Sequence, residues 1–131
     1  MTWLLDTSVC IPLINRSDTN LAARLLGHTP GSICLCSVVK AELHFGAQNS
    51  RRIAENLRRL ETFFGAFPSL PFDDDAAKHY GTIRAQLRRE GRPIGANDLM
   101  IAAIALAGSL MLATRDVEEF ERVPGLKVEG W

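Results

Sequence analysis

The chain has 131 residues, of which 47% are hydrophobic and 23% are charged. This composition excludes an intrinsically disordered protein. The length suits a single domain over residues 1–131 that buries a core without the help of disulfide bonds or structural metal ions. Fifteen basic and fifteen acidic side chains cancel, so the net charge predicts no nucleic-acid partner, and any such binding must come from local patches.

The sequence carries no signal for export or membrane insertion. Asp6 interrupts the apolar N-terminus before it reaches the length of a signal peptide. The longest apolar stretch, Leu99–Ala113, is broken by Gly108 and Ser109 and is shorter than the roughly 18 residues of a spanning helix. We therefore expect a cytoplasmic protein without membrane contact. The cysteines lie in apolar segments, and we expect reduced, buried thiols at Cys10, Cys34 and Cys36.

The first half of the chain alternates short apolar segments with helical patterns. Thr2–Leu5 is a predicted strand, and the hydroxyls of the Asp6-Thr7-Ser8 segment after it can cap a helix. Thr19-Asn20 is the predicted cap of a second helix, and Ser37 is the predicted N-cap of a third. The other elements expected here are helices around Cys10–Ile14, Leu21–Leu26 and Val38–Phe45, and a buried strand at Ser32–Cys36.

The second half starts with an amphipathic pattern, in which apolar residues recur at helical spacing from Ile53 to Phe64. A short edge strand is expected at Ser69–Phe72, because its prolines are tolerated at sheet edges. The run Asp73–Asp75 favours a helix start by interacting with the helix dipole. The remaining expected elements are helices at Ala76–Glu90 and Asp98–Ala107, and strands at Leu110–Ala113 and Leu126–Val128.

Strands that alternate with helices predict an α/β fold, with a mostly parallel central sheet of about four to five strands surrounded by helices. Ligand sites in such sheets lie at the carboxyl ends of the strands. Asp6 and Asp116 each follow a predicted strand, so both are expected at this edge. Glu42, about one and a half turns into its helix, and Asp98, at the start of the most apolar helix, can face the same edge.

Four carboxylates at one edge point to a metal site. Carboxylates brought together repel one another, and a hard divalent cation such as Mg²⁺ or Mn²⁺ relieves that repulsion and prefers oxygen ligands. Such a cation can activate water and stabilise charge on phosphoryl oxygens, which is the chemistry of a nuclease. Each residue alone also has a structural explanation: Asp6 as a helix cap, Asp98 as a dipole partner, Glu42 as a surface residue and Asp116 as part of a turn.

Two further functions are compatible with an acidic site. A phosphatase could use Asp6 as its nucleophile, but Ser8 stands where such enzymes have a second aspartate. A binding module could use the acidic pocket to receive a basic peptide, since opposite charges favour association. Turnover that depends on metal separates the nuclease from the binding module.

Several short motifs, in a fixed order, span nearly the whole chain. They are Leu4–Ser8, Ser37–Leu43 followed by Gly46, Gly91–Gly95 leading to Asp98–Ala103, and Thr114–Asp116 followed by Phe120–Leu126 and Trp131. In these motifs the sequence resembles the toxin subunits of type II toxin–antitoxin systems of the VapC kind, which belong to the PIN-domain nucleases.

The resemblance implies a PIN-like fold and a site-specific endoribonuclease that inhibits translation, with transfer or ribosomal RNA as substrate. It implies that Asp6, Glu42 and Asp98 bind Mg²⁺ or Mn²⁺, and that Asp116 is the fourth acidic member of the site. Glu118 and Glu119 are the alternatives to Asp116. The resemblance also implies supporting hydroxyls at Thr114 and Thr7, a small cognate antitoxin of the VapB type, and a homodimer.

Three arginines are candidates for RNA contact, because RNA affinity that is independent of sequence comes chiefly from basic side chains. We favour Arg84, Arg88 and Arg92, since the loop that carries Arg92 leads directly to Asp98. A solvated helix face is the alternative. The histidines lack metal-ligand spacing and are expected to be structural or surface residues, at positions His28, His44 and His79.

Overall fold

The computed structural model describes all residues, 1–131. Five strands form one sheet in the order β3-β2-β1-β4-β5, and all neighbouring strands are parallel. The strands are β1 (Trp3–Leu5), β2 (Ile33–Cys36), β3 (Ser69–Leu70), β4 (Met111–Thr114) and β5 (Lys127–Gly130). The predicted α/β fold with a parallel sheet is thus confirmed.

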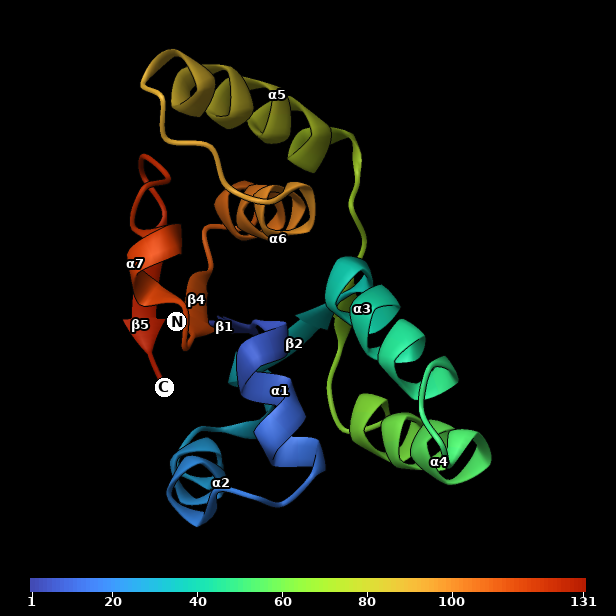
Figure 1. Ribbon diagram of the computed structural model, residues 1–131. Helices are drawn as coiled ribbons and strands as arrows, with labels where there is room; N and C mark the ends of the chain where they lie inside the picture. The colour runs from blue at the N-terminus through green and yellow to red at the C-terminus, as the bar shows by residue number, and fades with distance from the viewer.

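Seven α-helices surround the sheet. They are α1 (Thr7–Ile14), α2 (Thr19–Leu26), α3 (Ser37–Gln48), α4 (Ile53–Phe64), α5 (Asp74–Arg89), α6 (Ala96–Ala107) and α7 (Val117–Phe120). Helices α5 and α6 pack against each other, as do α3 and α4. In Figure 1, α6 lies between α5 and β4, and α1 and α2 lie below the strands. No helix has both the length and the apolar character needed to cross a membrane.

The direction of the chain across the sheet changes beside β1. From β1 the chain moves outward to β2 and β3, and it then returns past β1 to β4 and β5. In an open α/β sheet, the loops that leave the two central strands diverge at this point and open a crevice at the carboxyl edge. The Asp6 N–H donates to the Ala113 carbonyl at 2.9 Å, so the ends of β1 and β4 stay together up to the crevice.

The core is one cluster of 29 buried hydrophobic residues. Strand β2 is buried at every position, and six of the twelve residues of α6 are buried, which confirms α6 as the predicted buried helix. The three cysteines are buried and free, as predicted. Asp6 and Thr114 are the two buried polar residues. Burial of a polar group is costly unless it is hydrogen-bonded, so these two residues need partners inside the fold.

The predicted caps of α2 and α3 are wrong. Helix α2 is capped by Asp18, whose Oδ1 accepts a hydrogen bond from the Leu21 N–H at 3.0 Å, and not by Thr19-Asn20. Ser37 is the first residue of α3 and does not cap it, because its Oγ points to the Leu70 carbonyl. Helix α2 thus begins two residues before its predicted start at Leu21, and α3 begins one residue before its predicted start at Val38.

The C-terminal residue packs against the start of the chain. His28 lies between Trp3 and Trp131, with ring centroids 4.4 Å and 5.0 Å away. Glu129 Oε1 accepts hydrogen bonds from Trp131 Nε1 at 2.8 Å and from Arg24 of α2 at 2.6 Å. These donors hold the pKa of Glu129 below its usual range. The contact of His28 agrees with the structural role predicted for it.

Candidate active site

Asp6 lies at the end of β1 and is only 3% exposed. Two hydroxyls donate hydrogen bonds to its Oδ2, Ser8 Oγ at 2.8 Å and Thr114 Oγ1 at 2.8 Å. No hydrogen bond within the chain engages Oδ1. The carboxylate is therefore held through one oxygen, and the other is left for a ligand.

Backbone N–H groups fix the direction of both hydroxyls. The Arg115 N–H donates to Ser8 Oγ at 3.0 Å, and the Asp116 N–H donates to Thr114 Oγ1 at 2.9 Å. An ionised carboxylate can only accept, so the bonds to Asp6 Oδ2 use the hydroxyl protons, while the hydroxyl oxygens, 3.2 Å apart, accept the backbone N–H groups. Two parallel chains of hydrogen bonds thus run from the loop after β4 to a single carboxylate oxygen.

Ser8 is a site residue that the sequence pattern missed. A serine at a helix start predicts a cap, but α1 has no side-chain cap. Both hydroxyls predicted to cap it are used elsewhere, because Ser8 binds Asp6 and Thr7 binds Glu42. The only signal in the sequence was the position of Ser8 two residues after an aspartate that ends a strand.

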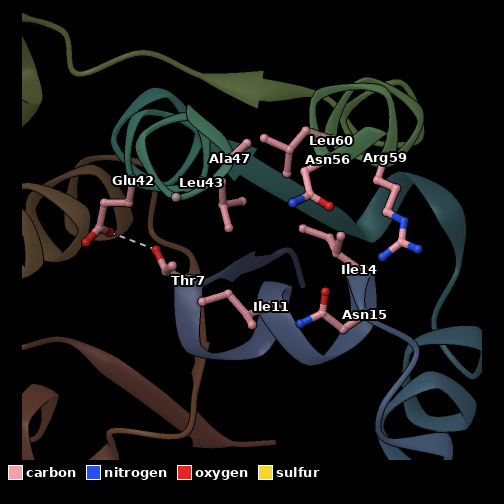
Figure 2. A pocket seen from close by; sticks show the side chains of 11 residues that line it. Thr7, Ile11, Ile14, Asn15, Glu42, Leu43, Ala47, Asn56, Arg59 and Leu60 are labelled. Carbon is pink, nitrogen blue, oxygen red and sulfur yellow. Dashed lines mark hydrogen bonds between the residues drawn. The ribbon is translucent and has the colours of Figure 1, made fainter. Parts of the chain in front are cut away.

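Glu42 lies on the face of α3 that is turned toward α1. Its Oε1 accepts a hydrogen bond from Thr7 Oγ1 at 2.7 Å (Figure 2). Thr7 begins α1, directly after Asp6. The Thr7 hydroxyl is therefore placed to orient the Glu42 carboxylate, and this hydrogen bond connects the start of α1 to α3.

Asp98 lies in the first turn of α6, which begins two residues before the predicted start. Partial burial and a hydrogen bond with Glu119 raise the pKa of Asp98 to about 7, and the charges of Glu119, Asp6 and Glu42 add to this shift. The structure therefore brings Asp98 close to Asp6 and Glu42, together with a fourth acid, Glu119 of α7.

Asp116 is exposed, and its side chain makes no hydrogen bond within the chain. Its backbone N–H donates to Thr114 Oγ1, which in turn donates to Asp6. Helix α7, which was not predicted, starts after Asp116 and turns Glu119 toward Asp98. Of the three acids considered for the fourth position, Glu119 is the one in contact with Asp98. The role of Asp116 at the metal stays a prediction.

The carboxylates provide only oxygen donors, which suits Mg²⁺ or Mn²⁺ better than a soft metal. No group of three Asp, Glu, His or Cys side chains is already arranged to hold an ion. Glu42 is hydrogen-bonded to Thr7, and Asp98 to Glu119. Besides burial, the charges of Glu119, Asp6 and Glu42 contribute to the raised pKa of Asp98. A divalent cation would compensate them, so these residues fit one.

A groove of about 250 Å³ leads away from Glu42 between α1, α3 and α4 (Figure 2). Apolar side chains form its middle, and the polar residues Asn15, Asn56 and Arg59 lie at its far end. A second hollow continues from there and adds Arg16 and Arg58. The groove is therefore acidic where it meets the site, apolar in the middle and basic at the other end.

A separate hollow of about 310 Å³ lies at the start of α6. Arg84 and Arg88 of α5 line it together with Leu99, the neighbour of Asp98. Arg92 is exposed and does not line this hollow. Two of the three arginines predicted to contact RNA thus flank the element that carries Asp98.

Thr114→Val tests the hydroxyl on Asp6. Valine has nearly the shape of threonine but leaves the Asp116 N–H and Asp6 Oδ2 without this partner, so we expect the free energy of unfolding to fall by about 1–3 kcal/mol. We also expect a loss of activity of about 10-fold or more, as for other groups that orient a metal ligand. Denaturant titration and a nuclease assay measure the two effects. Thr114→Ser keeps the hydroxyl and should remain near the wild type; equal losses in both variants would contradict the assignment.

The Asp98 pKa predicts that stability depends on pH when no metal is bound. Because the folded pKa, about 7, exceeds the ordinary value of 3.8, the folded state holds this proton more tightly than the unfolded state. Its contribution to stability is complete below pH 4 and is lost as pH rises to about 7. After discounting for solvent screening, we expect about 1–2 kcal/mol.

Thermal melts in EDTA between pH 4 and 8 measure this effect. Asp98→Asn cannot titrate, so the difference in Tm between the variant and the wild type should move in the variant's favour as pH rises. A difference that stays constant with pH would show that Asp98 has an ordinary pKa.

Comparison with known proteins places these features in context. The family model described as "PIN domain" matches residues 3–126. The chain is 39% identical to "tRNA(fMet)-specific endonuclease VapC" of Shigella flexneri, over 100% of this chain and 98% of the relative. The VapC protein of Salmonella typhimurium with the same name is 37% identical over the same shares.

Two solved structures have the same fold. DNA-bound VapBC from Salmonella typhimurium contains a chain with a TM-score of 0.95 and 37% identity, with coverage of 100% of this chain and 98% of that one. VapBC2 from Rickettsia felis, bound to a DNA fragment from its promoter, gives a TM-score of 0.94 and 32% identity, with coverage of 100% and 99%.

Proposed function

Because the chain belongs to the PIN-domain nucleases, in their VapC branch, we propose that it is a toxin whose activity is metal-dependent, site-specific hydrolysis of RNA and that it thereby inhibits translation. The observation that carries the proposal is the meeting of acids at one edge of the sheet. Burial and the contact with Glu119 raise the pKa of Asp98 to about 7, and the nearby charges of Asp6 and Glu42 add to this shift. Buried carboxylates that only stabilise a fold are normally paired with basic side chains. Asp6, Glu42, Asp98 and Glu119 form no ion pair within the chain.

We propose that Asp6, Glu42 and Asp98 hold Mg²⁺ or Mn²⁺, with Asp116 or Glu119 as the fourth acid. The bound ion supplies a water of lowered pKa and positive charge for the phosphoryl oxygens. Within the chain, Ser8 and Thr114 orient Asp6, and Thr7 orients Glu42. A bound cation would favour the ionised form of Asp98, so metal affinity should rise with pH.

For the substrate we propose transfer or ribosomal RNA, and the initiator tRNA is the first to test, because the Shigella flexneri relative is named as a tRNA(fMet)-specific endonuclease. The predicted phosphate contacts are Arg84, Arg88 and Arg92. The first two lie beside the start of α6, where RNA bound at Asp98 would pass. A binding site of this kind needs no net positive charge on the whole chain.

Arg88→Ala is expected to weaken RNA binding about equally for all sequences and to lower the salt slope of log K by about 1, since one phosphate contact is lost. Filter binding in Ca²⁺ at several salt concentrations, with cleavage blocked by Asp98→Asn, measures this slope. Arg89→Ala is the matched control, because Arg89 is exposed on the same helix but outside the hollow. Equal slopes for Arg88→Ala and wild type would remove Arg88 from the proposal.

A small antitoxin of the VapB type is the proposed protein partner, since the similar solved structures are VapBC assemblies. The groove in Figure 2 suits an amphipathic segment, because its acidic and basic ends enclose an apolar middle. We also propose a homodimer, and Phe45, 70% exposed on α3, is an apolar residue available to it. Residues 1–131 as one nuclease domain and the cytoplasm as its location remain our predictions.

Incubation of the purified protein with tRNA tests the function. Cleavage should stop in EDTA and return when Mn²⁺ is added in excess. Binding of RNA or of a basic peptide without any metal-dependent cleavage would overturn the nuclease and favour the binding module. Cleavage that persists in EDTA would overturn the metal-dependent mechanism.

A further inference from the structure

Arg115, the residue between Thr114 and Asp116, joins the site to a part of the fold outside it. Its backbone N–H donates to Ser8 Oγ at 3.0 Å, and Ser8 in turn donates to Asp6. Its guanidinium forms an ion pair with Asp18, before α2. The side chain therefore fixes the same residue whose backbone directs the Ser8 hydroxyl.

Asp18 uses both carboxylate oxygens. Oδ1 caps α2 by accepting the Leu21 N–H, and Oδ2 accepts from Arg115. One carboxylate thus ties the start of α2 to the loop after β4. The two segments lie 97 residues apart in the chain, so no local propensity holds them together.

The connection that leads to Asp18 is strained. Arg16, between α1 and α2, has a φ of 52°, a left-handed conformation that is uncommon for residues other than glycine and costs of order 1 kcal/mol or more. Such a turn persists only where the surrounding structure holds it. The Ser17 N–H donates to the Pro12 carbonyl at 3.1 Å and closes the turn as a helix C-cap. The Arg115–Asp18 pair follows directly after this turn, and α1 before it carries both Thr7 and Ser8.

We propose that Arg115 is a positioning residue of the metal site: its ion pair with Asp18 fixes the Arg115 N–H on Ser8 and thereby keeps the Asp6 carboxylate in the orientation in which it would hold the cation. This inference rests on the proposed binding of metal at Asp6. Arg115 does not touch the metal or the RNA in this role. It acts through Ser8.

The direction of the change in Mn²⁺ affinity distinguishes a positioning role of Arg115 from a purely electrostatic one. Removal of a cation near an acidic site should strengthen Mn²⁺ binding through long-range electrostatics, and removal of an anion should weaken it. Positioning instead predicts that Arg115→Ala and Asp18→Asn both weaken binding. Asparagine is as good an N-cap as aspartate, so Asp18→Asn removes the charge pair and keeps the start of α2.

Isothermal titration of the metal-free full-length protein with Mn²⁺ is the test. We expect Arg115→Ala and Asp18→Asn each to raise the Kd for Mn²⁺ about 3- to 10-fold, less than the 10- to 100-fold typical of groups in direct contact with a ligand residue. Arg115→Lys can keep the pair and should stay within about 2-fold. The double variant should match the single variants, because one pair is lost in all three.

Arg24→Ala is the matched control. Arg24 anchors the same helix through Glu129 and the Gly130 carbonyl, so its loss loosens α2 without touching Ser8. If this variant weakens Mn²⁺ binding as much as Arg115→Ala, α2 docking is the cause and the inference fails. Unchanged or tighter binding in Arg115→Ala also overturns it. If the wild type binds no Mn²⁺, or if Asp6→Asn binds it equally well, the proposed metal site itself fails.

Discussion

Asp6→Asn is expected to reduce RNA cleavage about 10³-fold or more, because the variant removes the charge of a proposed ligand of the metal, and a catalytic metal stabilises the transition state by several kcal/mol. The fold should survive this change. The amide oxygen of asparagine can still accept from Ser8 and Thr114, the two donors on Oδ2, and the variant removes a buried negative charge. The cleavage rate on tRNA in Mn²⁺ and the circular dichroism melt measure the two parts of the prediction.

Asp73→Asn provides the control for this experiment. Asp73 caps α5 through the Ala76 N–H, and asparagine caps equally well. The variant should cleave RNA at the wild-type rate. If Asp6→Asn retains activity within about 10-fold of the wild type, Asp6 is not a ligand of the catalytic metal, since ligand loss costs far more.

Phe120→Ala is expected to lower the free energy of unfolding by about 3–5 kcal/mol, the range for a fully buried aromatic residue. Phe120 is 0% exposed and is the buried residue of α7. For a chain of this size, we expect Tm to fall by about 10 °C or more. Thermal and denaturant unfolding measure the loss, and Phe120→Leu, which fills most of the volume, should cost less than about 1.5 kcal/mol.

The same variant affects the site. Glu119 precedes Phe120 and lies against Asp98, so loss of the anchor frees α7 to move Glu119 away. The pKa of Asp98 should then fall toward its ordinary value, which NMR titration of the carboxyl can follow at a temperature where the variant is folded. A drop in stability with an unchanged Asp98 pKa would show that α7 does not depend on Phe120 for its position.

The elements of the fold could be predicted because their patterns are local. Strand β2 is apolar at every position, and α4 shows its apolar residues at helical spacing. Helix α7 escaped prediction because four residues cannot display a helical period, and its stability comes from the burial of Phe120. The order of the strands was also beyond local patterns, since it places β1 beside β4, which is remote in the sequence.

The residues of the candidate site also differ in whether a local pattern or a tertiary contact reveals them. Asp6 follows β1, Glu42 lies within α3, and Asp98 lies in the first turn of α6. Their positions relative to these predicted elements were therefore enough to name them as candidate site residues. The hydroxyl of Ser8 and the carboxylate of Glu119 reach the site through tertiary contacts. A serine at a helix start is equally suited to capping, so residue type alone could not identify Ser8. Glu119 was named only as an alternative to Asp116, because an acid after a strand is equally suited to the surface.

The pairing of β1 with β4 has a consequence for how the active protein arises during synthesis. The residues that orient Asp6 include Thr114, 108 positions further along the chain. Contacts of such separation are slow to form, and β4 leaves the ribosome long after β1. A nascent chain therefore displays Asp6, the first of the proposed metal ligands, long before that side chain can be oriented, so the proposed site stays incomplete until β4 has emerged.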